Sequence, residues 1–266
     1  MSISNTHQTR LPSPASSSNH KTINVILFGE RSSGKSSVLN AIAQNSAVQT
    51  SSNATACPFN YQRDEVTIAS QRFALFDIAG LNEETASTAL DKEKLKGLLR
   101  ELTSAGSEGI GLLVYCVRCT TLRRALIRNY NLFYSAICKK KVPIVVVVTG
   151  LDIERDMESW WTTNGKDFKS RGMHFQDHAC VTTLHSYRGM PDALAHRIST
   201  SREILRNLIV KNCLELPVND ICINPTCVAV RNMIRDSESI PRENGVGHHR
   251  WCWRSILDIC SLLRCW

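Results

Sequence analysis

The sequence has few aromatic residues and lacks a segment that would direct it into or across a membrane. Phe, Trp and Tyr make up only 6% of the 266 residues, so a core built from this chain must be mainly aliphatic, as in buried parallel sheets. The N-terminus has no basic segment followed by an apolar run, which a secretory signal would need. The apolar stretch at 251–266 is too short and too charged to span a bilayer, which takes about 20 apolar residues. We therefore expect a cytoplasmic protein.

Strong clustering of charge is also lacking. The formal net charge is +8, but the basic residues are dispersed, and Lys139–Lys141 form the only tight run. We interpret this run as a solvated loop, with a phosphate or an acidic membrane as the alternative contact. The charge therefore does not predict nucleic-acid binding.

Disulfides are not expected, although the chain has 11 cysteines. Several of them, such as Cys116, Cys138 and Cys180, lie inside apolar segments, where a thiol packs as a small hydrophobic group. Without a secretory signal, this usage favours a reducing compartment.

The chain divides by composition into four segments. Residues 1–21 are rich in Ser, Asn, Thr and Pro without periodicity, which predicts a disordered tail. Residues 22–214 carry the periodic pattern of one α/β domain. Residues 215–250 lose that periodicity and gain prolines, which predicts an irregular extension. Residues 251–266 form an amphipathic tail, which we interpret as a helix packed on the domain, with an interfacial helix at a membrane surface as the alternative.

Apolar runs alternate with helical periodicities along the domain. Strands are predicted at 23–28, 65–69, 72–76, 111–117, 142–148 and 179–181, and helices at 35–43, 90–102, 122–138, 160–169 and 198–213. Such alternation implies a largely parallel sheet with helices on both faces, and the hairpin at 65–76 adds one antiparallel edge strand. The predicted fold is thus a three-layer α/β domain.

A phosphate-binding loop is the strongest motif. The segment Gly29-Glu-Arg-Ser-Ser-Gly-Lys-Ser36 matches G-x-x-x-x-G-K-[ST] at every defined position, between an apolar strand and a helix. Its glycines allow a tight turn whose N–H groups converge on phosphate oxygens. Lys35 supplies charge for the β- and γ-phosphates, and the Ser36 hydroxyl is placed to bind Mg²⁺. The predicted nucleotide cradle comprises Gly29, Glu30, Arg31, Ser32, Ser33, Gly34, Lys35, Ser36 and Ser37.

Two further elements are expected to serve the phosphates. Asp77-Ile-Ala-Gly80 follows an apolar strand and fits the D-x-x-G element of nucleotide switches. There Asp77 belongs beside the magnesium ion, and the Gly80 N–H can bind the γ-phosphate. The polar loop between the two motifs occupies the place of switch I. We predict Thr55 as its Mg²⁺-binding threonine, with Thr50 and Ser51 as alternatives.

Guanine recognition is predicted at Thr149-Gly-Leu-Asp152, which follows an apolar strand and resembles [NT]-K-x-D. The Asp152 carboxylate can accept two hydrogen bonds from the guanine edge, whereas adenine has no matching donors. Gly150 replaces the lysine whose stem usually covers the ring, and a capping role for Asp152 in a turn is the alternative interpretation. Downstream, Thr182 and Thr183 sit where a backbone N–H could meet the guanine oxygen.

The sequence names no catalytic residue. Leu81 follows the D-x-x-G glycine, and a leucine cannot orient the attacking water, so intrinsic hydrolysis should be slow. Glu83 and Glu84 are interpreted as solvated acids of the loop, with orientation of the attacking water as the alternative. Arg31 is a candidate arginine finger, with a surface or partner contact as the equal alternative.

With these residues placed, the chain resembles the septin-related GTPases, near the immunity-associated and chloroplast-import branch, and most closely the short G-domain proteins of fungi. The resemblance covers about 23–213 and rests on 29–37, 51–57, 77–81 and 149–152. It implies a P-loop G domain over 22–214 that binds GTP and dimerises through its nucleotide face when loaded. Several such relatives sit at membranes.

Together, the residues and the resemblance predict a Mg²⁺-dependent GTP-binding protein with slow GTP hydrolysis. It would act as a switch or as a nucleotide-controlled assembly module. A nucleotide-dependent homodimer and a peripheral membrane contact through its C-terminal tail are its candidate partners. A non-hydrolysing nucleotide-binding interaction module and a P-loop ATPase are the alternatives.

Overall fold

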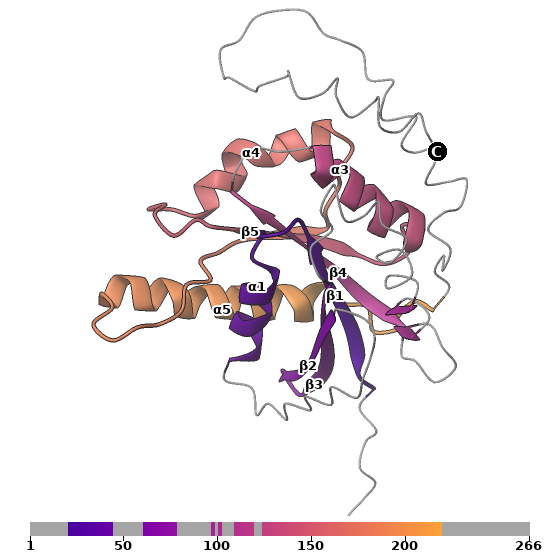
Figure 1. The fold of residues 1–266 in the computed structure, drawn as a ribbon, viewed down its shortest axis with the longest axis horizontal. Helices are drawn as coiled ribbons and strands as arrows, with labels where there is room; N and C mark the ends of the chain where they lie inside the picture. The colour runs from indigo at the N-terminus through magenta and orange to yellow at the C-terminus, as the bar shows by residue number, and fades with distance from the viewer. Residues whose placement is uncertain are drawn as a thin grey trace, which may run out of the picture.

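The computed structural model describes residues 21–44, 61–78, 97–98, 101–102, 109–119 and 124–219 (Figure 1). The predicted tail at 251–266 lies outside these residues, as do all but one residue of the predicted tail at 1–21 and most of the extension at 215–250. Among the described residues, no helix is long and apolar enough to cross a membrane.

A six-stranded sheet forms the centre of the domain, in the order β2-β3-β1-β4-β5-β6. Five strands are parallel to one another: β1 (Ile23–Gly29), β3 (Gln71–Ile78), β4 (Ile110–Arg118), β5 (Ile144–Thr149) and β6 (Asp177–Cys180). The edge strand β2 (Tyr61–Ile68) runs antiparallel to β3. The mostly parallel sheet with an antiparallel edge strand is thus confirmed.

The hairpin that joins β2 to β3 turns one residue earlier than the predicted Ser70-Gln71. Ala69 and Ser70 occupy the turn, with φ of 49° and 67°. Two central residues at positive φ are typical of a type I′ turn, which suits the twist of a two-residue hairpin. The sequence did not indicate the exact position of this turn, because neither residue is a glycine or an asparagine.

Helices cover both faces of the sheet and complete three layers. Helices α1 (Lys35–Ala43) and α5 (Asp192–Asn212) lie on one face, and α3 (Arg124–Tyr130), the π-helical segment η1 (Asn131–Ile137) and α4 (Glu158–Ser170) lie on the other (Figure 1). Alternate residues of β1 serve the two layers. Val25 and Leu27 pack with α1 and α5, whereas Ile26 and Phe28 pack with α3 and α4.

Helix α4 extends the predicted 160–169 by two residues at its start and one at its end, and two other helices differ from their predictions in character or start. The helix predicted at 122–138 is an α-helix that continues as η1, where the Cys138 N–H donates to the Phe133 carbonyl at 2.9 Å. Helix α5 starts at Asp192 rather than 198, directly after Pro191. Its first turns are mostly exposed, so they lack the apolar periodicity from which the start was predicted. Proline before the first turn was the available signal.

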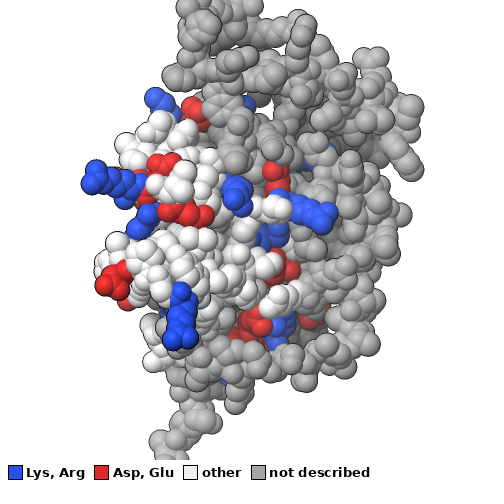
Figure 2. All heavy atoms as spheres, turned by 60° about the vertical axis from the view of Figure 1, so that its left-hand side comes forward, with Lys and Arg blue, Asp and Glu red and all other residues white. Residues whose placement is uncertain are grey.

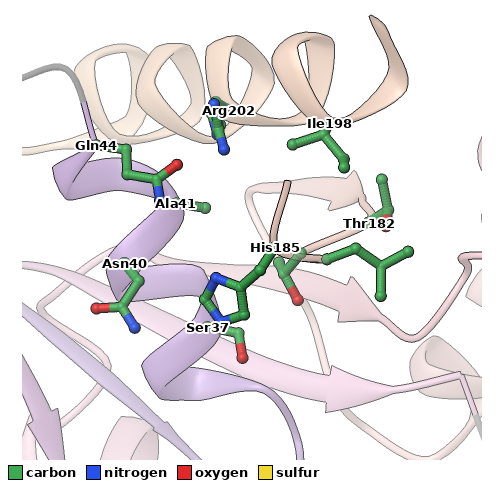
Figure 3. A pocket seen from close by; sticks show the side chains of 10 residues that line it. Ser37, Asn40, Ala41, Gln44, Thr182, His185, Ile198 and Arg202 are labelled. Atoms are coloured by element: carbon green, nitrogen blue, oxygen red, sulfur yellow. The ribbon is translucent and has the colours of Figure 1, made fainter. Parts of the chain in front are cut away.

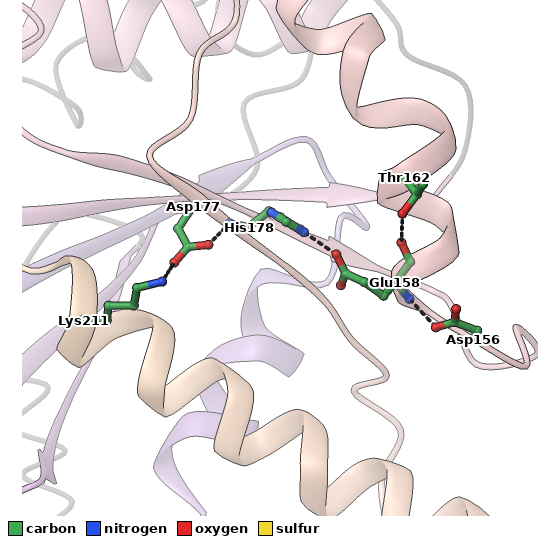
Figure 4. Close-up of polar contacts among 6 residues, drawn as sticks. All are labelled: Asp156, Glu158, Thr162, Asp177, His178 and Lys211. Carbon is green, nitrogen blue, oxygen red and sulfur yellow. Dashed lines mark hydrogen bonds and ion pairs between the residues drawn. The ribbon is translucent and has the colours of Figure 1, made fainter.

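Side chains of the edge strand β6 contact helices on both faces of the sheet (Figure 4). The Asp177 carboxylate pairs with the Lys211 ammonium of α5 at 2.8 Å. The next residue, His178, pairs with Glu158 of α4 and stacks on the Trp161 ring, with centroids 4.4 Å apart. Because β6 is short, these contacts fix where the following loop leaves the sheet.

Aromatic side chains concentrate in the layer of α3 and α4, so the expected aliphatic core holds mainly for the opposite face. Tyr115 of β4 stacks on Phe28 with centroids 4.7 Å apart, and Phe28 contacts Phe133 at 4.4 Å. The fully buried Tyr115 hydroxyl donates to the Leu126 carbonyl at 2.8 Å, and its burial raises the Tyr115 pKa well above the usual range. This neutral hydroxyl ties α3 to the central strands.

Replacing Tyr115 by Phe keeps the ring and removes only that hydroxyl. We expect the free energy of unfolding to fall by about 1 kcal/mol, since the Leu126 carbonyl loses a buried partner. Urea unfolding followed by far-UV circular dichroism measures the difference.

Tyr187→Phe is the matched control, because the Tyr187 side chain is 59% exposed. Its free energy of unfolding should stay at the wild-type value. Equal stability of the two variants would show that the Tyr115 hydroxyl does not hold α3.

Candidate functional site

The candidate site lies where the parallel strands end. In the sheet register, Leu27 of β1 is the neighbour of Asp77 in β3, and Gly29 is the neighbour of Cys116 in β4. Arg118 at the end of β4 is in turn the neighbour of Thr149 in β5. Strand β1 lies between β3 and β4, where the strand order reverses, and such a switch point is where open α/β sheets bind their ligands.

Lys35 folds back onto the loop that joins β1 to α1. Its ammonium donates to the Gly29 carbonyl at 3.3 Å and to the Glu30 carbonyl at 2.8 Å. The side chain is buried, which lowers the Lys35 pKa, while the nearby carboxylate of Asp77 acts in the opposite direction. A buried ammonium that is held only by carbonyl oxygens is poorly compensated, so it can favourably bind an anion.

The loop ends at Gly34, which caps α1 with φ of +86°. A Cβ at this position would lie 3.0 Å from Thr149 Oγ1 in the left-handed region, so only glycine fits. Ser33, next to it, is buried, and its hydroxyl has no partner among the described residues. The positive end of the α1 dipole and an unpaired polar group thus meet at this loop.

Ser36 and Asp77 form the candidate metal site. The Ser36 hydroxyl donates to Asp77 Oδ2 at 2.5 Å, whereas the buried Oδ1 has no partner among the described residues. Burial raises the Asp77 pKa, while the bond from Ser36 and the charge of Lys35 lower it. A hydroxyl and a carboxylate oxygen are ligands that Mg²⁺ prefers, and an ion here would compensate the unpaired oxygen. These residues therefore fit Mg²⁺.

Thr149 joins β5 to the phosphate-binding loop. It is buried, and its hydroxyl donates to the Ser33 carbonyl at 2.8 Å, with a longer contact of 3.5 Å to Val117. The sequence predicted Thr149 as a base-binding residue but gave no hint of this contact, because Ser33 lies 116 positions away in the chain. The bond couples the segment at 149–152 to the loop at 29–34.

Asp152 is held by residues from two other segments. One of its carboxylate oxygens accepts a hydrogen bond from the Thr182 hydroxyl at 2.5 Å. The Arg197 guanidinium of α5 donates to the carbonyls of Leu151, Asp152 and Glu154 at 3.1, 3.2 and 2.5 Å. The contact with Thr182 is long-range, unlike the local backbone contact that a capping aspartate would make. Sequence reasoning missed Arg197, because it lies in the part of α5 that was not predicted.

A small hollow, open to solvent, lies between α1, α5 and the loop after β6 (Figure 3). The Ser37 side chain faces this hollow, and Arg202 and His185 reach towards it from α5 and the loop. The Thr182 N–H donates to Ser201 at 3.2 Å, which leaves Thr183 as the candidate amide of the predicted pair. The remaining lining residues are Asn40, Ala41, Gln44, Thr182, Thr183, Leu184 and Ile198.

The other predicted site residues lie on the phosphate-binding loop or outside the described residues. Arg31 and Ser32 are exposed, and Glu30 is half-buried. Thr55, Gly80 and Leu81 lie outside the described residues.

Thr149→Val tests the bond between β5 and the loop. Valine keeps the shape but cannot donate, so we expect the nucleotide-free protein to lose about 1–2 kcal/mol of unfolding free energy. Thermal or urea unfolding measures the loss.

The control is Thr163→Val, which removes an exposed hydroxyl that bonds to the Ser159 carbonyl within α4 at 2.9 Å. Its effect should be at most a few tenths of a kcal/mol. If both variants lose the same unfolding free energy, the buried bond of Thr149 stabilises the protein no more than an exposed bond does.

Part of the chain is similar to known proteins. Residues 24–150 match the family model of the 50S ribosome-binding GTPases, and no curated protein sequence matches the chain. The chain is similar to Era of Aquifex aeolicus (17% identity, 76% of this chain and 61% of that chain covered, TM-score 0.49). It is also similar to the elongation factor SelB of Methanococcus maripaludis (14% identity, 72% of this chain and 34% of that chain covered, TM-score 0.45). A third similar structure is Toc33 of Arabidopsis thaliana (16% identity, 74% of this chain and 88% of that chain covered, TM-score 0.43).

The chain thus spans less than two thirds of the length of Era and of SelB. The family match covers the phosphate-binding loop, Asp77 and Thr149, and the sheet has five parallel strands with one antiparallel edge strand. The described residues therefore have the α/β fold of a P-loop GTPase G domain.

Proposed function

We propose that this protein binds GTP and GDP with Mg²⁺ through a G domain that extends over residues 22–214. The observation that carries the proposal is the arrangement at the strand ends. The Lys35 ammonium and the Ser36–Asp77 pair lie at the same edge of the sheet as Asp152, and the Thr149–Ser33 bond links the two parts. The match to a GTPase family model supports the same assignment.

The phosphates would lie in the loop at 29–37. Lys35 would exchange its two carbonyl partners for phosphate oxygens, which accept stronger, charge-assisted hydrogen bonds. The backbone N–H groups around Gly34 and the start of α1 would add further donors. The Gly80 N–H would contact the γ-phosphate.

Ser36, Asp77 and Thr55 would hold the magnesium ion. The ion would neutralise phosphate charge when bound. Ser36 would turn its hydroxyl oxygen away from hydrogen bonding with Asp77, and the orphaned Oδ1 of Asp77 would gain a compensating charge nearby.

Asp152 would select guanine. Its carboxylate is oriented by the Thr182 hydroxyl, and its backbone is held by Arg197, so little motion is needed on binding. Guanine presents a ring N–H and an amino group that can both donate to this carboxylate, and adenine presents no such pair.

Hydrolysis would be slow, since Leu81 cannot orient the attacking water. The protein would then act in the cytoplasm as a nucleotide-controlled switch or assembly module. We include in this proposal a nucleotide-dependent homodimer and a peripheral membrane contact of the tail at 251–266. Leu81 also favours a second candidate, an interaction module that binds nucleotide without turnover.

Fluorescent GDP, GTP, ADP and ATP analogues, with Mg²⁺, test the base assignment on wild type and Asp152→Asn. Wild type should bind only the guanine nucleotides. The variant should bind them roughly 10- to 100-fold more weakly, because charged hydrogen bonds at the guanine edge are lost. It should gain affinity for xanthine nucleotides, whose second oxygen can accept from the new amide.

Asp156→Asn is the matched control, because Asp156 is exposed and its contact with the Glu158 N–H is one that asparagine can also make. It should bind like wild type. Adenine binding by wild type, or indifference to the Asp152 substitution, would disprove guanine selection.

The metal assignment is tested by Ser36→Ala. Removal of Mg²⁺ with EDTA should weaken GDP binding by wild type about tenfold or more, and the variant in Mg²⁺ should bind as weakly as wild type in EDTA. Titrations with and without EDTA give both values.

Ser170→Ala, which removes an exposed hydroxyl bonded to the Asp167 carbonyl, is the control and should keep the full effect of Mg²⁺. If Ser36→Ala also keeps that effect, Ser36 is not a metal ligand.

A further inference from the structure

Gly150 stands where guanine-binding segments usually carry lysine, and the structure shows that a side chain would be strained and crowded there. The backbone has φ of +78°, a conformation that side chains other than glycine rarely adopt. A Cβ on Gly150 would lie 3.2 Å from Cγ and 3.4 Å from Nε of Arg118. The space at the start of a residue-150 side chain is thus already bordered by an arginine.

Arg118 reaches Gly150 from the neighbouring strand. It is the last residue of β4 and lies in register with Thr149. The next residue, Cys119, locks the two strand ends together, because its N–H donates to the Thr149 carbonyl and its thiol to the Gly150 carbonyl, both at 2.9 Å. The backbone of Arg118 is therefore held beside Gly150, and its stem lies against Gly150 although the residue is exposed.

The charge of Arg118 is available for a ligand. Among the described residues, its guanidinium has no hydrogen-bond or ion-pair partner, while its stem contacts Gly150. Burial raises the pKa of the Cys119 thiol, the charge of Arg118 lowers it, and the carboxylates of Glu154 and Asp152 raise it. Arg118 and Asp152 therefore both lie near the Cys119 thiol.

We propose that Arg118 replaces the missing lysine and covers one face of the purine whose edge Asp152 binds. This inference rests on the proposed nucleotide binding and names a residue for it. A guanidinium is planar and weakly hydrated, so it stacks on an aromatic ring better than an ammonium does, and its stem adds apolar contact. Gly150 then has a definite role, because the absence of a side chain leaves room for the arginine.

A stacking role has a signature that an edge contact does not have. Stacking depends on the ring face, which guanine and hypoxanthine share, whereas Asp152 reads the amino group that only guanine carries. Loss of Arg118 should therefore weaken the binding of GDP and the binding of IDP by the same factor. Loss of the Asp152 carboxylate should change their ratio.

The test measures the affinity of the full chain for ribose-labelled GDP and IDP in wild type, Arg118→Ala and Arg118→Lys. We expect Arg118→Ala to bind both nucleotides roughly 5- to 30-fold more weakly with an unchanged ratio, as expected for a lost cation–π contact. Arg118→Lys should recover part of the affinity. Circular dichroism of nucleotide-free protein should show the same fold, because Arg118 is exposed.

Arg72→Ala is the matched control. Arg72 is an exposed arginine at the start of β3, at the end of the sheet away from the candidate site, and its removal should leave both affinities unchanged.

The possible failures are distinguishable. If Arg118→Ala binds like wild type while Asp152→Asn binds more weakly, Arg118 does not cover the base, and the proposed nucleotide binding stands. A changed ratio of GDP to IDP affinity in Arg118→Ala would place the arginine at the base edge and overturn the stacking role. If wild type binds no guanine nucleotide, the proposed function fails and this inference fails with it.

Discussion

The buried hydrogen bond from Thr149 to the Ser33 carbonyl is the contact on which the geometry of the candidate site depends. The loop after β1 and the turn after β5 are separate in sequence, and β4 lies between their strands. Without a direct link, two flexible connections would each have to find their place independently. The hydrogen bond from the Thr149 hydroxyl restricts the motion of both connections. Gly34 makes this bond possible, because a side chain at position 34 would collide with Thr149. Preorganisation of this kind reduces the entropy that a ligand must otherwise overcome.

Burial of charge is the second constraint, and it opposes stability. Lys35 and Asp77 are both shielded from water, and burial shifts each pKa towards the neutral form. The protein tolerates these charges through carbonyl contacts for Lys35 and one hydroxyl contact for Asp77, and the second carboxylate oxygen has no partner within the part of the chain that the structure describes. A fold that served only its own stability would not keep such groups in this form. A ligand with phosphate and a divalent cation, as proposed above, would supply what both groups lack.

The sequence predicted the fold because its main signals are local. The apolar run of β5, the hairpin and the motif at 29–36 each indicate their structure within a short window. The predicted helix bounds were wrong where residues are exposed and so show no apolar periodicity, as at the start of α5. The predicted helix type was wrong where the hydrogen bonding changes along a helix, as in η1. Arg197 and Arg118 could not be found in this way, because their contacts depend on which segments the sheet and α5 bring together. The one local clue was Gly150, where a missing side chain pointed to a neighbour that fills the space.

The two edges of the sheet differ in a way that bears on aggregation and assembly. At one edge, β6 has only four residues, and its side chains are engaged with α4 and α5. At the other, β2 carries exposed or half-buried polar and charged side chains, including the Arg63–Glu65 ion pair. Short strands and charged edges discourage another strand from adding to a sheet. Copies of this protein should therefore resist fibrous aggregation, and any ordered assembly is expected to form through helices and loops rather than through a continued sheet.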